Sequence, residues 1–255
     1  MRTQAVNYYQ SVNPSTLTGA IDVIAHELTH GVTQYTANLE YRGQSGALNE
    51  SISDVFGSLV KQWSLSQTAA QADWLIGSEC WTPQIRGDAL RSMKNPGSAF
   101  DDPTIGKDMQ PGHMRHYKQM PETPDADMGG VHINSGIPNH AFCLFACNVG
   151  GFAWETAGQI WYEALQRSKK DTNFDAFANT TYFIAGENFD TPTQKALQAA
   201  WDEVGIRVGK KDKASSGKLV VTPDYKHDDL ATAVRRLAEH VSELQRDVDA
   251  IKQPT

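Results

Sequence analysis

The sequence predicts a mainly α-helical fold followed by a linker and a separate helix. Apolar residues recur at intervals of three and four over residues 22–36, and again after the turn-forming segment RGQSG at 42–46. The same spacing returns at 137–148, 154–168, 173–186 and 192–204. Between these regions, residues 82–130 are rich in Pro, Gly, Asp and Asn, and we expect long surface loops there.

The C-terminal tail predicts two further segments, a flexible polar linker over residues 209–227 and an amphipathic helix over residues 228–252. Seven apolar residues of this helix alternate spacings of four and three, the heptad pattern of a coiled coil: Leu230, Val234, Leu237, Val241, Leu244, Val248 and Ile251. This pattern favours a parallel homodimer through residues 230–251. A helix that packs on its own domain explains the pattern equally well.

Composition and charge argue against several classes of function. With 30 acidic and 23 basic residues, the formal net charge of −7 is unlike that of a nucleic-acid-binding surface. No run of ~18 apolar residues is present, so we expect no membrane-spanning helix. The first residues contain no apolar core of the kind a signal peptide needs, and the residues alone do not predict the compartment.

A metal-binding motif lies on the first predicted helix. His26, Glu27 and His30 form the pattern His-Glu-x-x-His, in which the two histidines share one helix face. Zinc accepts imidazole nitrogens at ~2.0–2.1 Å, and one helical turn gives two imidazoles a suitable separation. Glu27 is rotated by about 100° from His26, where a carboxylate can act as general base on a zinc-bound water. Two solvent-exposed histidines on an amphipathic helix are the alternative.

A catalytic zinc with two histidine ligands needs a third protein ligand. Glu50 lies on the second predicted helix, and Asp54 follows it one turn later on the same face. We expect Glu50 to bind the ion. Asp54 would accept the second ring N–H of a ligand histidine and thereby fix its tautomer. Without the nearby motif, both would be interpreted as ordinary surface acids.

Four segments occur in the order in which they are found in the thermolysin family of metallopeptidases. They are HELTHGVTQYTANLEY from residue 26, SGALNESISDVFG from residue 45, GDALRSM from residue 87 and GGVHINSG from residue 129. The sequence therefore resembles that family, and most closely its protealysin-like branch, over residues 19–205. The resemblance implies a zinc metalloendopeptidase with a thermolysin-like helical lobe, a peptide or protein substrate and an extracellular location.

Carried over by position, the resemblance implies the same three zinc ligands and a base at Glu27. Asp54 would support His26, and Asn49 would support His30. This ligand set is a property of the family and agrees with the spacing of the motif.

The resemblance also implies groups that stabilise the reaction's negative charge. His132 would donate to the developing oxyanion, oriented by Asp127, and Tyr41 would help from the other side. One preorganised donor of this kind typically contributes ~2.7–4 kcal/mol.

A substrate pocket is implied by the third segment. Arg91 would stand beside the pocket for the residue after the scissile bond, and Val23 and Leu90 would line that pocket. This implies a preference for bulky apolar residues at that position of the substrate.

The sequence departs from the family in front of the motif. Family members carry a β-rich lobe before the zinc helix, whereas only 25 residues precede His26 here. We therefore expect residues 1–36 to be a remnant of that lobe with the zinc helix, and residues 37–208 to form the helical peptidase lobe. The rest of the N-terminal lobe would then be missing or supplied by a partner.

A second departure concerns calcium. Asp22 and Asp73 match the family's structural calcium site, but Lys61, Leu75 and Ser78 stand where acids are usual. An ammonium group and lost carboxylates oppose the binding of a hard cation. We expect no double calcium site, and a weak single site at most.

Three functions remain open from the sequence. The first is a zinc metalloendopeptidase with Glu27 as general base. The second is a catalytically impaired zinc-binding scaffold or fragment that assembles through its C-terminal helix. The third is a zinc hydrolase of small molecules on the same ligand set.

Overall fold

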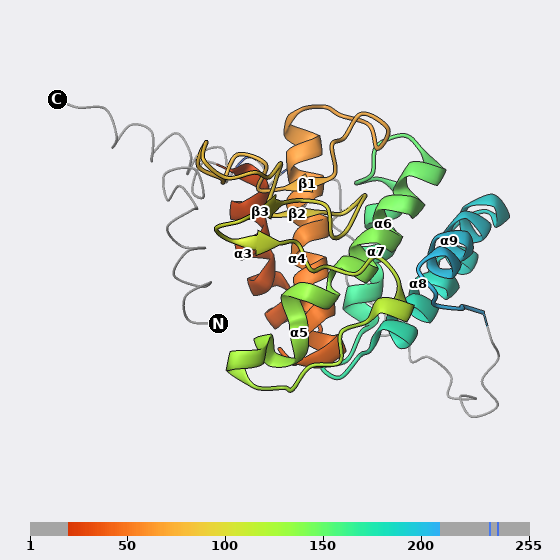
Figure 1. Ribbon diagram of the computed structural model, residues 1–255. Coiled ribbons are helices and arrows are strands. Elements are labelled where there is room, and N and C mark those ends of the chain that lie inside the picture. Colours follow the sequence, from red (N-terminus) through yellow and green to blue (C-terminus); the bar gives the residue numbers. More distant parts are fainter. Residues whose placement is uncertain (1–19, 210–234, 236–238, 240–255) are drawn as a thin grey trace.

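The computed structural model describes residues 20–209, together with Arg235 and Glu239 (Figure 1). Within these residues the mainly α-helical prediction is confirmed. Residues 1–19, most of the predicted linker and the seven apolar residues of the heptad pattern lie outside the described residues. The remnant lobe, the linker, the terminal helix and the homodimer therefore stay predictions.

Two adjacent helices form the centre of the described part, α3 (Ile21–Tyr35) and α4 (Gly43–Ser64) (Figure 1). The sequence predicts α3 within one residue at each end. It predicts α4 to begin after residue 46, but the helix begins at Gly43. The Ser45 hydroxyl and the Gly46 amide both donate to the Arg42 carbonyl, at 3.0 and 2.9 Å. These bonds close a first turn in a segment whose composition is typical of a loop.

The backbones of α3 and α4 approach each other closely at Gly57. A Cβ atom at this position would lie 2.5 Å from the Asp22 carbonyl oxygen, which is closer than real Cβ contacts. Glycine is therefore needed there, since the contact involves backbone that cannot rotate away. α4 is buried along most of its length, and its inner residues include polar ones that face α3.

Five further helices complete the helical part of the described residues: α5 (Asp127–Asn134), α6 (Gly136–Val149), α7 (Thr156–Arg167), α8 (Phe174–Asn188) and α9 (Thr191–Glu203). The sequence predicts the last four within two residues at each end. Side-chain caps begin two of them, because Asn173 accepts from the Ala176 amide before α8 and Asp190 accepts from the Thr193 amide before α9.

α5 falls partly inside a predicted loop, and its backbone explains why. Four consecutive residues, Asp127 to Gly130, have positive φ values of 55°, 48°, 94° and 75°. This left-handed turn precedes the right-handed part that carries His132. Two adjacent glycines indicate a break in a helix, and here they permit the turn that leads into one.

Short strands and 3₁₀ turns connect α4 to α5. β1 (Leu75–Ile76) pairs antiparallel with β2 (Arg91–Ser92), and β3 (Asp101–Asp102) pairs antiparallel with β4 (Gly106–Lys107). Two 3₁₀ helices follow, η1 (Met114–His116) and η2 (Pro124–Ala126). The prediction of long loops over 82–130 is confirmed apart from these short elements, which are too brief to leave a periodic signal.

An aromatic cluster joins the C-terminal helices. The Trp161 ring stacks on Trp201, with ring centroids 5.6 Å apart, and meets Phe142 edge-on at 5.0 Å. All three side chains are buried. Trp201 also donates its ring N–H to the Thr181 hydroxyl at 2.9 Å. The cluster joins α6, α7 and α9 in one hydrophobic core, which also contains the buried apolar residues of α4.

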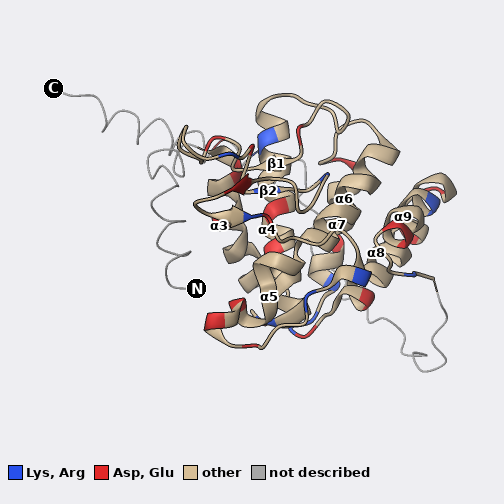
Figure 2. Ribbon diagram, viewed as in Figure 1, with Lys and Arg blue, Asp and Glu red and all other residues tan. Residues whose placement is uncertain are grey.

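Charged residues are mixed in sign over the described part. Figure 2 shows Lys and Arg scattered among Asp and Glu, with acidic residues on α4 in the middle of the fold. Among the described helices, none is both long enough and apolar enough to cross a membrane.

Replacing Trp161 by Ala is expected to lower the free energy of unfolding by about 3–5 kcal/mol, because it opens a cavity at the centre of the aromatic cluster. Phe183, an α8 aromatic residue that is 48% exposed, is the matched control, and Phe183→Ala should change stability by only ~0.5 kcal/mol. Urea unfolding at fixed zinc concentration measures both. Equal losses in the two variants would contradict the placement of Trp161.

Candidate active site

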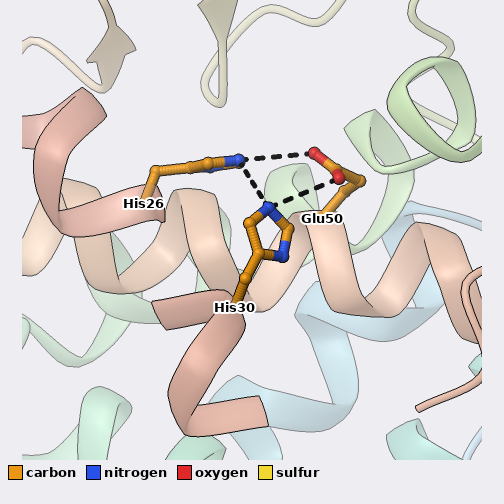
Figure 3. A group of neighbouring side chains, drawn as sticks. All are labelled: His26, His30 and Glu50. Carbon is orange, nitrogen blue, oxygen red and sulfur yellow. Dashed lines mark hydrogen bonds and ion pairs between the residues drawn. The ribbon is translucent and has the colours of Figure 1, made fainter. Parts of the chain in front are cut away.

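The contact between α3 and α4 brings His26, His30 and Glu50 together (Figure 3). One ligand atom from each lies within 4.8 Å of the other two. The two histidines project from successive turns of α3, and Glu50 meets them from α4. Among the described residues, this is the group of histidine, cysteine and acidic side chains that could hold a metal ion.

The spacing of the three groups fits a tetrahedral zinc ion. The two Nε2 atoms are 3.2 Å apart, and the Glu50 oxygens lie 3.4 Å from His26 Nε2 and 3.6 Å from His30 Nε2. Zinc–ligand bonds of ~2.0–2.1 Å in a tetrahedron place ligand atoms about 3.3 Å apart. The predicted ligand set is therefore assembled with a suitable spacing.

Hydrogen bonds behind the two histidines determine which ring nitrogen of each faces the site. His26 Nδ1 lies 2.8 Å from Asp54 Oδ1, and His30 Nδ1 lies 2.8 Å from Asn49 Oδ1. Because both partners are acceptors, each Nδ1 carries a proton, and each Nε2 can present a lone pair. Glu50 is 1% exposed, and its Oε2 has no hydrogen-bond partner within the described residues. Three acceptors that converge in this way require a positive charge between them.

The pKa values of His26 and Glu50 also indicate that a positive charge is favoured between these side chains. Burial lowers the pKa of His26, but the hydrogen bonds to Asp54 and Glu50 outweigh it and raise the pKa to about 9. Burial raises the pKa of Glu50, but His26 and His132 outweigh it and bring the pKa down to about 2. Glu50 is therefore charged at neutral pH, and without a metal ion a proton on His26 balances that charge. A bound metal ion would take the place of this proton.

Asp54 is the most heavily bonded residue of the site. It is fully buried, and Arg91 donates to both of its oxygens at 2.6 and 2.8 Å. Asn139 donates to Oδ2 at 2.8 Å. Burial raises the pKa of Asp54, but Arg91 and His26 hold it well below its usual range. The carboxylate that orients His26 is thus itself fixed from three sides, as expected for a residue that supports a metal ligand.

His132 approaches the site from α5 and lies beside Glu50. Its Nδ1 lies 2.6 Å from Asp127 Oδ1, and its backbone amide donates to Asp127 Oδ2 at 3.0 Å. Its Nε2 lies 3.4 Å from Glu50 Oε1 and 3.2 Å from the Tyr41 hydroxyl. The left-handed turn at 127–130 makes this double contact possible, because it folds the Asp127 carboxylate back over the first turn of the helix.

Tyr41 completes this side of the site. Its hydroxyl donates to Glu50 Oε1. Burial and the neighbouring Glu50 charge raise the pKa of Tyr41, so the hydroxyl keeps its proton at neutral pH.

A cavity of about 500 Å³ opens above the three converging groups. Glu27 is exposed and lies in its wall. The lining consists of residues from α3, α4, α5 and the loop after α3: His26, Glu27, His30, Gln34, Asn38, Leu39, Tyr41, Asn49, Glu50 and His132. The predicted base and oxyanion donor therefore share one cavity with the ligands.

The three residues expected to form a substrate pocket lie outside this cavity lining. Val23 and Leu90 pack against buried Ala20 and Cys80 in a small separate cluster. Arg91 faces Asp54, with its Nη2 also 3.5 Å from His26 Nδ1. Their part in substrate binding stays a prediction.

Sequence reasoning does not find several supporting residues. Asn139 holds Asp54 from α6, and the Ser53 hydroxyl lies 3.2 Å from His30 Nδ1. Gln110 donates to the His132 carbonyl at 2.7 Å and to the Ser135 hydroxyl at 3.0 Å. Ser53 follows Asn49 by four residues on the same predicted helix, a spacing that indicates a shared face toward His30. Asn139 and Gln110 come from distant segments and carry none.

The family model described as "Thermolysin metallopeptidase, alpha-helical domain" matches residues 37–206. This chain belongs to the thermolysin family. The chain is 52% identical over 198 residues to "Protease PrtS" of Photorhabdus sp. (strain Az29), a match that covers 77% of this chain and 53% of that protein. It is 51% identical over 191 residues to an "Extracellular metalloprotease" of Pectobacterium carotovorum subsp. carotovorum, covering 74% and 54%.

A solved structure supports the protealysin-like branch of the family. The precursor of protealysin, a metalloproteinase from Serratia proteamaculans, superimposes with a TM-score of 0.72 at 52% identity. The match covers 77% of this chain and 60% of that one. The chain thus spans about half the length of the curated relatives that it matches.

Replacing Asp54 by Asn is expected to weaken zinc binding about 10- to 100-fold, because the amide cannot hold both His26 and Arg91 as the carboxylate does. Competition with a chromophoric chelator measures the affinity. Asp202→Asn, an exposed acid on α9, is the control and should bind zinc as the unmodified chain does. Unchanged affinity in Asp54→Asn would show that the carboxylate does not support the metal ligand.

Proposed function

We propose that this chain carries the catalytic centre of a zinc metalloendopeptidase that hydrolyses internal peptide bonds. One observation supports this most strongly. His26, His30 and Glu50 converge with spacings of 3.2–3.6 Å beneath a cavity that also contains Glu27 and His132. Membership of a family of zinc-dependent metallopeptidases supports the same assignment.

The chemistry divides between the metal and the chain's own residues. A zinc ion on these ligands would lower the pKa of a water and polarise the peptide carbonyl. Glu27, in the cavity wall beside the ligands, takes a proton from the attacking water and later passes it to the leaving amine. Its exposed position on α3 leaves the carboxylate able to reach both places.

His132 and Tyr41 stabilise, by hydrogen bonds, the negative charge that develops on the former carbonyl oxygen. Burial lowers the pKa of His132, but the bond to Asp127 and the Glu50 charge raise it overall, which favours a proton on Nε2. Tyr41 retains its hydroxyl proton, as its raised pKa requires. His132 is therefore a donor, and Tyr41 becomes one when its hydroxyl turns from Glu50 Oε1 to the substrate oxygen. One such donor is worth ~2.7–4 kcal/mol in the transition state.

The proposal also includes a preference for apolar substrate residues and an extracellular location. The preference for apolar residues after the scissile bond rests on the family resemblance at Val23 and Leu90, which are apolar side chains outside the cavity lining. Relatives from Pectobacterium and Serratia marcescens are named extracellular proteases, which supports a secreted enzyme.

One observation favours a second candidate function, a zinc-binding scaffold without peptidase activity. Asp54 and Asn49 hold the two histidines from behind, so the group that could hold a metal can be kept for binding alone. Such a scaffold would keep the ligands and would have no use for Glu27 or His132.

Replacing Glu27 by Ala should reduce the zinc-dependent cleavage of a quenched peptide by about 10²–10⁴-fold, since the general base is lost. Zinc affinity should stay the same, because Glu27 is not a ligand. Glu203→Ala, an exposed acid on α9, is the matched control and should retain full activity.

The same assay separates the candidate functions. Cleavage that is abolished by a chelator and restored by zinc supports the peptidase. Zinc binding without cleavage of casein or peptide in the unmodified chain would favour the scaffold, and hydrolysis restricted to small esters would favour a small-molecule hydrolase.

A further inference from the structure

The ammonium group of Lys61, near the end of α4, lies among oxygen atoms. Lys61 Nζ is 2.9 and 3.3 Å from the two carboxylate oxygens of Asp73 and 3.4 Å from Asp22 Oδ2. It is also 3.3 Å from the Leu75 carbonyl oxygen and 3.3 Å from the Ser78 hydroxyl. We call these five oxygen atoms the oxygen cage. The Lys61 side chain is 14% exposed, so the ammonium is largely withdrawn from water.

The oxygen cage is built from separate parts of the chain. Asp22 belongs to the first turn of α3, Lys61 to α4, and the remaining oxygens to residues 73–78 around β1. Asp22 is 2% exposed and also accepts the Gly77 amide at 3.1 Å. The Lys61 ammonium therefore links α3, α4 and residues 73–78. Its partner Asp22 lies one helical turn before His26 on α3.

Five oxygens exceed what an ammonium group can satisfy. A lysine has three N–H donors and one positive charge, whereas the cage presents two carboxylates, a carbonyl and a hydroxyl. This mixture of oxygen ligands is the chemistry that Ca²⁺ prefers, at 2.3–2.6 Å with about six to eight ligands. Burial raises the pKa of Asp22, and the charge of Lys61 is the largest influence that opposes it. The cage thus needs a cation, and the chain supplies one covalently.

We propose that Lys61 is a built-in cation that occupies an oxygen site for a divalent ion, and that this site binds Ca²⁺ once the ammonium is removed. The unmodified chain then holds the first turn of α3 against α4 and residues 73–78 without calcium. This inference concerns stability and cation binding, so it stands or falls separately from the proposed peptidase activity.

The first test removes the ammonium. Lys61→Met keeps an unbranched side chain one atom shorter but leaves the buried Asp22 carboxylate without its counter-charge. Its melting temperature should fall by about 5–10 °C, the shift expected when one partner of a buried ion pair is lost. Lys107→Met is the matched control, because Lys107 pairs with Asp101 at 3.5 Å with both side chains exposed. That control should melt within about 1 °C of the unmodified chain.

The second test replaces the ammonium with a metal ligand. Lys61→Glu adds a third carboxylate to the cage, and 10 mM Ca²⁺ should raise its melting temperature by about 5–10 °C, the shift expected at about 100 times Kd. The unmodified chain and Lys107→Met should shift by less than about 1 °C. Lys61→Gln, which offers an amide oxygen without extra charge, is measured in parallel in case Lys61→Glu does not fold without calcium.

The full 255-residue chain is used throughout, with Glu27→Ala in every sample and one fixed zinc concentration, so that self-cleavage and zinc loss do not alter melting. A calcium shift confined to the Lys61 variants supports the proposal. A shift of equal size in the unmodified chain, or folded Lys61→Glu and Lys61→Gln variants that ignore calcium, would overturn it.

Discussion

The close backbone contact between α3 and α4 is the constraint on which the rest of the structure depends. With no side chain at Gly57, the Asp22 carbonyl comes within a distance that a Cβ atom would block. This approach lets side chains of α4 reach the histidines of α3 directly, with Asp54 at 2.8 Å from His26. A wider separation of the helices would leave three ligands without a common centre.

The close contact of α3 and α4 buries charged side chains, whose removal from water costs free energy. Two clusters on α4 balance these charges. At the middle of α4, the fully buried Asp54 is met by an arginine, an amide and an imidazole. Near the end of α4, Lys61 faces two carboxylates. Buried charge is tolerated only when paired and hydrogen-bonded, and each of these clusters meets that condition.

Local patterns account for the parts of the structure that the sequence predicts. The bounds of α3, α6, α7, α8 and α9 follow from apolar periodicity. The group that could hold a metal follows from residue spacing on two helices. Periodicity does not report contacts between distant segments, so Asn139 on α6, 85 residues from Asp54, was not predicted. Apolar periodicity also cannot distinguish a glycine pair that ends a helix from one that forms a left-handed turn before a helix. For this reason the sequence predicts a loop over the first residues of α5.

The left-handed entry at 127–130 belongs to one of two parts of the site, which differ in how far apart in the sequence their contacts lie. The metal-binding part is joined by contacts such as His26 to Asp54, 28 residues apart in sequence. His132 reaches Tyr41 across 91 residues, and only after a turn in which Asp127 and Met128 adopt a backbone region unfavourable for residues with a Cβ. Closing the longer loop costs about 1 kcal/mol more chain entropy, so the contact between His132 and Tyr41 depends more on the rest of the fold than the contact between His26 and Asp54 does. The group that could hold a metal is thus built from contacts of shorter range than the side of the site that carries His132.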